Sequence, residues 1–456
     1  MIPKEIFKAY DIRGVVETSL TPDNVELIGK AFGSEALEQG METIVLGRDG
    51  RLTGPKLVQS LAKGIISTGC HVIDVGQVPT PALYYATVKL KTGTGIQVTG
   101  SHNPPEYNGL KMMISGYTLS GEAIQNLRHR IIEGNFTHGQ GQSMEQAILS
   151  DYCNAIVEDV SVHRPLKVAI DCGNGVAAAC APDIFKRLGC EVVELFCDVD
   201  GNFPNHHPDP SQLENLQDLI EAVKTHNADF GMAFDGDADR LGVVTAKGKV
   251  IWPDRQMVLF SKDILEKNPG SEIIFDVKCS QILPQLIAQH GGKATMWKTG
   301  HSFIKSKLKE TGAALAGEMS GHIFFNDRWG GFDDGIYAGA RLCELLSTHK
   351  EHPDMVFESI PDTINTPELR LEMEEGEHYQ LVSELVEAAN FENAEVSTLD
   401  GVRVDFEDGF GLLRASNTTP TIILRFEASH ESQLAFIQKK FRQLFGQVRP
   451  NLKLPF

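Results

Sequence analysis

Four short loops of this 456-residue sequence carry side chains whose types and spacing could perform chemistry. In the first, Ser101 is followed by a histidine, an asparagine and two prolines and is framed by glycines. Such a loop is stiff and holds one side chain in a fixed pose. Ser101 is therefore our candidate for the reacting group, with an ordinary proline-rich turn as the alternative. A hydrolase nucleophile elbow is excluded, because the pattern G-x-S-x-G would need glycine where Thr99 and Asn103 stand.

The second loop places three carboxylates at alternate positions, Asp235, Asp237 and Asp239. In an extended chain alternate side chains point the same way, so they could hold a divalent cation. The alternative is a solvated acidic turn, but such closely spaced carboxylates repel one another unless a cation offsets their charge. An EF-hand would need glycine sixth and glutamate twelfth, where Arg240 and Ala246 stand. Three side-chain ligands leave coordination positions open, which suits Mg²⁺ with a phosphate oxygen and water.

The third loop holds Glu318 and Ser320 two residues apart between glycines. A carboxylate and a hydroxyl at this spacing can accept from and donate to adjacent hydroxyls, as on a sugar ring, although a polar strand end looks the same. Lys278 and His301 lie upstream at predicted strand ends. They are either cations of the same site or ordinary solvated surface.

The fourth loop begins at Arg414 and continues through hydroxyl and amide side chains to Pro420, with Arg425 on the following strand. A guanidinium, several hydroxyls and turn amides can form a phosphate cradle. A polar hairpin turn explains the loop equally well when the loop is judged alone.

Composition limits the classes of function. The formal net charge of −19 argues against binding to nucleic acid or an anionic membrane, since either would be repelled over most of the surface. No stretch approaches the ~20 apolar residues of a membrane span, and the segment after Met1 lacks the apolar core of a signal peptide. The eight cysteines are scattered without a CxxC pair, which favours reduced buried thiols over disulfides or a zinc site. We expect a cytoplasmic protein.

Strands that alternate with helices must position the loops. Buried strands are expected at residues 43–47, 70–75 and 95–98, and the last delivers the Ser101 loop at its carboxyl end. The same order recurs from about 166 and again from about 272, so we predict three related mixed α/β domains, with coincidence among generic βαβ units as the alternative. A smaller α+β domain follows. The predicted domains are residues 1–146, 147–249, 250–363 and 364–456, which carry the four loops in order.

Together these loops resemble those of the α-D-phosphohexomutase family, and the chain is similar to its bacterial phosphomannomutase/phosphoglucomutase branch. The match covers nearly the whole length, in order: Tyr10 to Gly14, Thr99 to Asn103, Asp235 to Arg240, Gly317 to His322 and Arg414 to Thr419. The resemblance implies four domains, three of them topologically related, around a central active-site cleft. This implication agrees with the repeat pattern.

The resemblance also implies roles for individual residues. Ser101 would be a phosphoserine that binds Mg²⁺ together with the three aspartates of the second loop. Lys111 and His301 would be candidates for proton transfer and charge stabilisation, beside Arg13 and Arg240. The implied substrate-binding residues are Tyr10, Lys278, Glu318, Ser320, His322, Arg414, Ser416, Asn417, Thr418 and Arg425.

The implied activity is the reversible interconversion of hexose 1-phosphate and hexose 6-phosphate through a hexose 1,6-bisphosphate, which also acts as activator. Glucosamine-specific members typically have glutamine where this chain has Met319, which favours mannose and glucose phosphates. Ala238 stands where glycine is frequent, but its side chain is not a ligand. Phosphoglucosamine mutase, a non-catalytic sugar-phosphate-binding protein and a sugar phosphatase are the alternatives. We expect small-molecule partners only and a monomer or weak oligomer.

Overall fold

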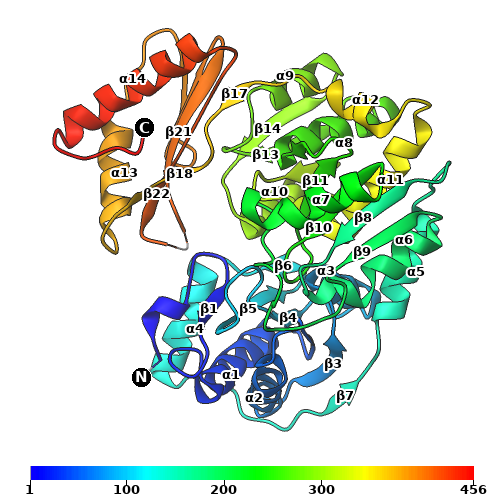
Figure 1. Ribbon diagram of the computed structural model, residues 1–456. Coiled ribbons are helices and arrows are strands. Elements are labelled where there is room, and N and C mark those ends of the chain that lie inside the picture. The colour runs from blue at the N-terminus through cyan, green and yellow to red at the C-terminus, as the bar shows by residue number, and fades with distance from the viewer. Residues whose placement is uncertain (1, 418) are drawn as a thin grey trace.

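The computed structural model describes residues 2–417 and 419–456, so the prediction for Thr418 lies outside the described residues. Four sheets follow one another along the chain. In Figure 1 the first sheet lies at the bottom, the second and third occupy the right and the top, and the fourth lies at the upper left with the C-terminus.

The first three sheets share one topology. In each, three parallel strands are ordered third, first, second, and a fourth strand runs antiparallel beside the third. The strands of the first sheet are β2 (Thr43–Arg48), β3 (His71–Gln77), β4 (Gly95–Val98) and β5 (Tyr107–Ile114). Their counterparts are β8 (Lys167–Asp171), β9 (Glu191–Leu195), β10 (Phe230–Phe234) and β11 (Leu241–Thr245) in the second sheet, and β13 (Glu272–Asp276), β14 (Lys293–Trp297), β15 (Leu315–Gly317) and β16 (Ile323–Phe325) in the third. The prediction of three related mixed α/β domains is confirmed.

Short strands extend two of these sheets. They are β1 (Ile12–Val15), β6 (Tyr117–Thr118) and β7 (Ser143–Glu145) in the first and β12 (Val250–Ile251) in the second. The central strands β4 and β10 are buried along their whole length. Continuous apolar burial is typical of parallel sheets that are covered on both faces. Because parallel strands end at the same edge of a sheet, the polar turns that follow them lie together at that edge.

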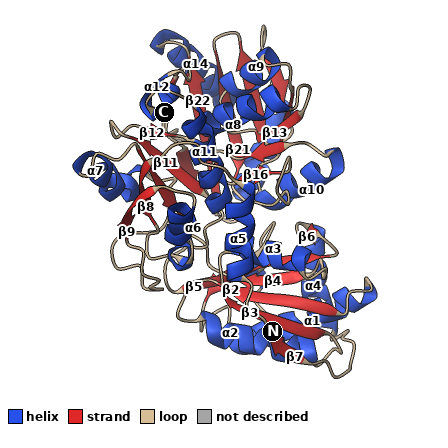
Figure 2. Cartoon of the chain, turned by 90° about the vertical axis from the view of Figure 1, so that its right-hand side faces the viewer, coloured by secondary structure: helices blue, strands red, loops and turns tan. Residues whose placement is uncertain are grey.

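Helices cover these sheets. They are α1 (Pro22–Glu38), α2 (Gly54–Ile66), α3 (Thr80–Lys89), α4 (Glu122–Glu133), α5 (Leu149–Asp159), α6 (Ala181–Arg187), α7 (Gln217–Thr225), α8 (Pro253–Lys267), α9 (Ile282–Gln289), α10 (His301–Thr311), α11 (Gly335–Thr348) and α12 (Pro353–Glu358). Short 3-10 turns span Lys4–Ile6, Val176–Ala179 and Leu213–Leu216. Helix α1 has an N-cap, because the Thr21 hydroxyl accepts from the Asn24 amide at 3.2 Å. Helix α5 lies between the first and second sheets and contacts α3 and α6 (Figure 2).

The fourth sheet is antiparallel and carries its own helices, as expected for an α+β domain. Its strands are β17 (Ile364–Asn365), β18 (Leu369–Glu372), β19 (Glu395–Ser397), β20 (Val402–Phe406), β21 (Gly409–Ala415) and β22 (Thr421–Ala428), and its helices are α13 (Glu377–Ala388) and α14 (Glu431–Val448). No helix among the described residues combines the length and apolar composition needed to cross a membrane.

The hydrophobic core divides unevenly among the sheets. One continuous cluster extends from Val45 in the first sheet through the second and third sheets to Phe357, and a separate cluster joins the first sheet to α1, α2 and α4. The fourth sheet packs on a separate cluster with α13 and α14. A small cluster of Val277, Phe410 and Leu412 joins the third sheet to the fourth. The fourth domain therefore shares little apolar surface with the rest of the chain.

Candidate active site

Three of the four predicted loops are equivalent hairpins, each joining the third and fourth strands of its sheet. Ser101 lies between β4 and β5, the aspartates between β10 and β11, and Glu318 and Ser320 between β15 and β16. The hairpins meet one another. A β-bridge pairs Arg240 with His322, and a Cβ on Gly236 would lie 2.3 Å from the carbonyl oxygen of Ser101. Gly236 must therefore be glycine for the first two loops to touch.

Ser101 is held in a strained pose against the carboxylates. Its φ is +48°, a region that costs a non-glycine residue about 1–3 kcal/mol. The Ser101 amide donates to Thr99 Oγ1 at 2.8 Å, and Thr99 donates in turn to Asp49 at 2.8 Å. The Ser101 hydroxyl donates to Asp235 Oδ2 at 2.9 Å and lies 3.0 Å from His102 Nδ1. The reacting oxygen is therefore aimed at the aspartate loop.

Arg51 fixes the backbone of this loop, and the sequence reasoning missed it. Its guanidinium is buried and lies 3.3 Å from Asp49 through Nε. It donates to four carbonyl oxygens of the loop, those of Ser101 (2.8 Å), Asn103 (2.5 Å), Pro104 (2.6 Å) and Tyr107 (2.9 Å). A Cβ on Gly100 would lie 2.4 Å from Arg51 Cζ, so glycine is required there. A charged turn at the carboxyl end of the first parallel strand was the available sequence signal.

The three aspartates form one buried group. Their side chains are 0% exposed, and ligand oxygens of all three lie within 4.8 Å of one another. Lys111 Nζ lies 2.7 Å from Asp237 Oδ2 and also contacts Asp239. Among the described residues, Oδ1 of Asp237 and Oδ1 of Asp239 have no hydrogen-bond partner. Unpartnered buried carboxylate oxygens beside the Ser101 hydroxyl fit a divalent cation such as Mg²⁺.

The pKa shifts of the three aspartates and Lys111 indicate that the buried carboxylates need positive charge beside them. Burial, and then the charges of the other two aspartates, hold the pKa of Asp235 well above its usual value. Burial alone would raise the pKa of Asp237, but Lys111 outweighs it and lowers that pKa. Burial would lower the pKa of Lys111, and the aspartates reverse this and raise it. Lys111 is therefore an ammonium at neutral pH. Ala238, between the ligands, has φ +65°, which explains why glycine also suits this position.

His322 lies at the junction of the second and third hairpins. Its Nε2 accepts from Arg240 Nε at 3.0 Å, and its Nδ1 lies 3.0 Å from Asp333 Oδ2. Asp333 also accepts from Lys305 at 2.8 Å and lies 3.7 Å from His301 Nδ1. Burial and the neighbouring Lys305 lower the pKa of His301 well below its usual value, so that ring is neutral. Asp333 and Lys305 were not predicted to belong to the site.

Glu318 is buried in the third hairpin. Its Oε1 accepts from the Gly300 amide at 2.6 Å, and its Oε2 has no hydrogen-bond partner among the described residues. Burial raises the pKa of Glu318 to about 7. Ser320 beside it is partly exposed.

The ring of Tyr10 lies edge-on to His301, with centroids 5.2 Å apart, and Lys278 pairs with Glu368 at 3.2 Å. Lys278 and His301 are thus buried side chains and not part of the solvated surface.

Arg13 joins the serine loop directly, since its guanidinium donates to Asn103 Oδ1 and also pairs with Asp11.

The fourth loop approaches from the other side of the chain. Arg414 Nε donates to Asp400 at 3.0 Å, and Asp400 also accepts from the Thr299 amide, so this loop touches the third domain. Ser416 and Asn417 follow at the tip.

Arg425 does not share the position of the other loop residues. Its guanidinium donates to Asp254 at 3.1 Å and to the carbonyl of Lys278, and it is buried between the third and fourth domains. Side chains alternate faces along a strand, and this one points to the domain interface. Arg425 therefore contacts the interface between the third and fourth domains, and its role in substrate binding stays a prediction.

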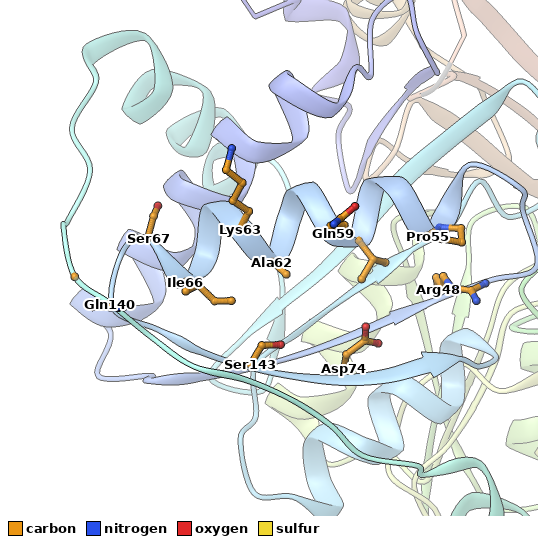
Figure 3. A pocket seen from close by; sticks show the side chains of 12 residues that line it. Arg48, Pro55, Gln59, Ala62, Lys63, Ile66, Ser67, Asp74, Gln140 and Ser143 are labelled. Carbon is orange, nitrogen blue, oxygen red and sulfur yellow. The ribbon is translucent and has the colours of Figure 1, made fainter.

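A surface groove of about 630 Å³ lies elsewhere, along α2 and the strands β3 and β7 (Figure 3). Val58, Ala62 and Ile66 form its apolar side, and Arg48 and Asp74 lie at one end. None of the predicted site residues that the structure describes lines this groove.

This architecture is that of an α-D-phosphohexomutase: three related α/β domains, a fourth domain with an antiparallel sheet, and a serine that faces three aspartates. Family comparison agrees over nearly the whole chain. Residues 4–138, 150–248 and 252–364 match the alpha/beta/alpha domains I, II and III of phosphoglucomutase/phosphomannomutase, and residues 368–444 match its C-terminal domain. The chain belongs to the phosphoglucomutase/phosphomannomutase family, and the resemblance inferred from its motifs is confirmed.

Individual relatives are similar over their full length. A phosphomannomutase/phosphoglucomutase of Pseudomonas syringae pv. tomato is 53% identical over 456 residues, covering 100% of this chain and 98% of the relative. A phosphoglucomutase of Neisseria meningitidis serogroup A is 54% identical over 458 residues, with 100% and 99% covered. The crystal structure of a phosphoglucomutase/phosphomannomutase family protein from Burkholderia thailandensis superimposes with a TM-score of 0.95 at 50% identity and covers 100% of both chains.

Proposed function

We propose that this protein interconverts hexose 1-phosphate and hexose 6-phosphate, with mannose and glucose phosphates as its substrates. The observation that carries the proposal is the Ser101 hydroxyl, which is 2.9 Å from Asp235 in a group of three buried carboxylates. Relatives that share more than half of the sequence are named phosphomannomutase/phosphoglucomutase or phosphoglucomutase, which supports it. The protein is accordingly an isomerase that moves a phosphoryl group between positions of one sugar.

Ser101 would carry the phosphoryl group in the resting enzyme. Asp235, Asp237 and Asp239 would hold Mg²⁺ together with the phosphate oxygens, and the ion would offset charge on the group being transferred. Lys111 and Arg240 add fixed positive charge from either side of the carboxylates. Because Ser101 gives its group away, no base is needed to activate this serine at the start of a cycle.

The hydroxyl of the sugar that attacks must lose a proton, and His301 is the group that can accept it. Burial and Lys305 keep this ring neutral, and among the described residues neither of its ring nitrogens has a hydrogen-bond partner, so one of them has a free lone pair. His322 suits this role less well, because its Nε2 already accepts from Arg240 at 3.0 Å. Lys111 suits proton acceptance less well, because its carboxylate neighbours keep it charged.

A second transfer returns the other phosphate of a hexose 1,6-bisphosphate to Ser101, so the sugar must turn around between the steps. Glu318 and Ser320 would accept the ring in both orientations, and Arg414 with Ser416 and Asn417 would hold the phosphate that is not reacting. The separate core of the fourth domain supports a movement of this domain that retains the intermediate.

The test measures conversion of glucose 1-phosphate, mannose 1-phosphate and glucosamine 1-phosphate with Mg²⁺ and a hexose 1,6-bisphosphate as activator. We expect turnover of the first two, phosphate on Ser101 by intact mass, and no turnover for Ser101→Ala. Ser115→Ala is a matched control, since Ser115 also has positive φ, +50°, but lies on an exposed turn. Equal turnover of the glucosamine ester would favour a phosphoglucosamine mutase. Binding without turnover, or release of free phosphate, would refute the proposal.

A further inference from the structure

Six of the eight cysteines lie as three pairs of neighbouring thiols in the described part of the chain. The pairs are Cys172 with Cys197, Cys153 with Cys180, and Cys190 with Cys343. All eight are free thiols, and Cys197 alone is partly exposed while the others are buried. One pair therefore combines the thiol of a partly exposed residue with a second thiol in contact with it.

The backbone brings these two sulfur atoms together. Cys172 follows β8 and Cys197 follows β9, and these parallel strands pair with Asp171 opposite Leu195. The Cys172 amide donates to the Leu195 carbonyl at 3.1 Å, and the two Sγ atoms are 3.5 Å apart. A disulfide requires about 2.05 Å, so the sulfurs need to approach by roughly 1.5 Å.

Both cysteines precede segments that contact the aspartate loop. Cys172 begins the turn whose Val176 amide donates to the Gly236 carbonyl at 3.2 Å. Cys197 begins the segment that leads to Pro208, and a Cβ on Gly236 would lie 3.5 Å from Pro208 Cγ. A covalent bond between the strand ends would therefore move the two segments on which Gly236 rests.

We propose that Cys172 and Cys197 form a reversible disulfide on exposure to a peroxide, and that this bond lowers turnover by shifting the aspartate loop. The effect on turnover rests on the proposed function, whereas the disulfide does not. The partly exposed Cys197 thiol loses its proton and its sulfur attacks a peroxide oxygen, the O–O bond breaks, and a sulfenic acid and hydroxide form; the hydroxide takes up the proton as water. The Cys172 sulfur then attacks the sulfenic sulfur, its proton leaves with the hydroxyl as a second water, and the S–S bond forms. Two electrons pass from the thiols to the peroxide.

The surroundings assign the order of the two steps. The hydrogen bond with Cys197 and burial hold the pKa of Cys172 well above its usual value, so Cys172 is the resolving thiol. The Cys190 and Cys343 pair is buried on both sides and offers the oxidant no accessible sulfur.

The experiment treats the full-length protein with hydrogen peroxide and maps its peptides without reduction. We expect one cross-link, between the Cys172 and Cys197 peptides, with a mass about 2 Da lower than the two thiol peptides together. Turnover should fall at least about fivefold and return with dithiothreitol. Cys197→Ser should keep its activity under peroxide, and the matched variant Cys190→Ser should still respond as the wild type does.

Several outcomes would overturn the proposal. A sulfinic acid on Cys197 without a cross-link, or a cross-link in another pair, would show that these thiols are not a functional pair. A cross-link that leaves turnover unchanged would refute the effect on the aspartate loop. The peptide map of the wild type decides the first point even if Cys197→Ser fails to fold. A protein without mutase activity would refute the proposed function and leave that map decisive.

Discussion

Replacement of Lys111 by methionine should make the stability of the protein strongly dependent on Mg²⁺. Lys111 Nζ lies 2.7 Å from Asp237 Oδ2, and both side chains are almost fully buried. At this separation the attraction is roughly 6 kcal/mol for an effective dielectric of 20, and burial of the charges offsets part of it. Loss of one partner of a buried pair costs about 3–5 kcal/mol, because the other charge remains without compensation. We expect a loss of about 3 kcal/mol in the absence of divalent cations.

The assay is urea unfolding followed by circular dichroism, in EDTA and in excess Mg²⁺. A ligand that binds only the folded state adds about 2.7 kcal/mol at 100 times its dissociation constant. The variant should gain more from Mg²⁺ than the wild type, because no ammonium competes for the carboxylates. Lys63→Met is the control: Lys63 pairs with Glu26 at 2.6 Å but is 72% exposed, so this variant should unfold like the wild type. An unchanged urea midpoint of Lys111→Met in EDTA, or equal gains from Mg²⁺, would refute the reasoning.

Three further outcomes are expected. Arg51→Lys keeps the charge, but lysine lacks the planar fork of donors that holds the loop carbonyls. The kcat should therefore fall about 10- to 100-fold with little change in KM. An unchanged kcat would contradict the role of Arg51 in positioning the serine loop. Burial raises the pKa of Glu318 to about 7, above its usual value, so Glu318 becomes negatively charged as the pH rises. The KM for glucose 1-phosphate should therefore decrease between about pH 6 and pH 8. Glu318→Gln should abolish this pH dependence of KM. Asp333→Asn should lower kcat about 100-fold while circular dichroism is unchanged, because Lys305 loses its charged acceptor and the charge beside His301 and His322 is removed. Normal turnover would exclude that role.

The serine and aspartate loops could be found from the sequence because their chemistry is local. Alternate carboxylates in one turn repel one another unless a cation is present, and Ser101 is confined by its neighbouring prolines and glycines. The repeated strand order was also visible, since buried parallel strands appear as short apolar runs that alternate with helices.

Residues whose partners are distant in the chain escaped this reasoning. Arg51 stands in an ordinary charged turn, and its partners are carbonyl oxygens about fifty positions later, which have no signature in side-chain types. Asp333 precedes a helix and meets His322 only after the third hairpin folds back. Arg425 shows a second limit of the sequence. A strand residue next to a loop can point to either face of its sheet, and contacts between domains determine the face to which Arg425 points.

The unequal division of the hydrophobic core predicts how the chain can be cut. One cluster joins buried residues of the first, second and third domains, so a fragment that ended between the second and third sheets would expose apolar surface and aggregate. The fourth domain has its own core, and its boundary falls at a small apolar contact. A fragment from residue 364 onward should therefore fold as an independent unit. Thermal unfolding of the whole chain should likewise show two cooperative transitions instead of four.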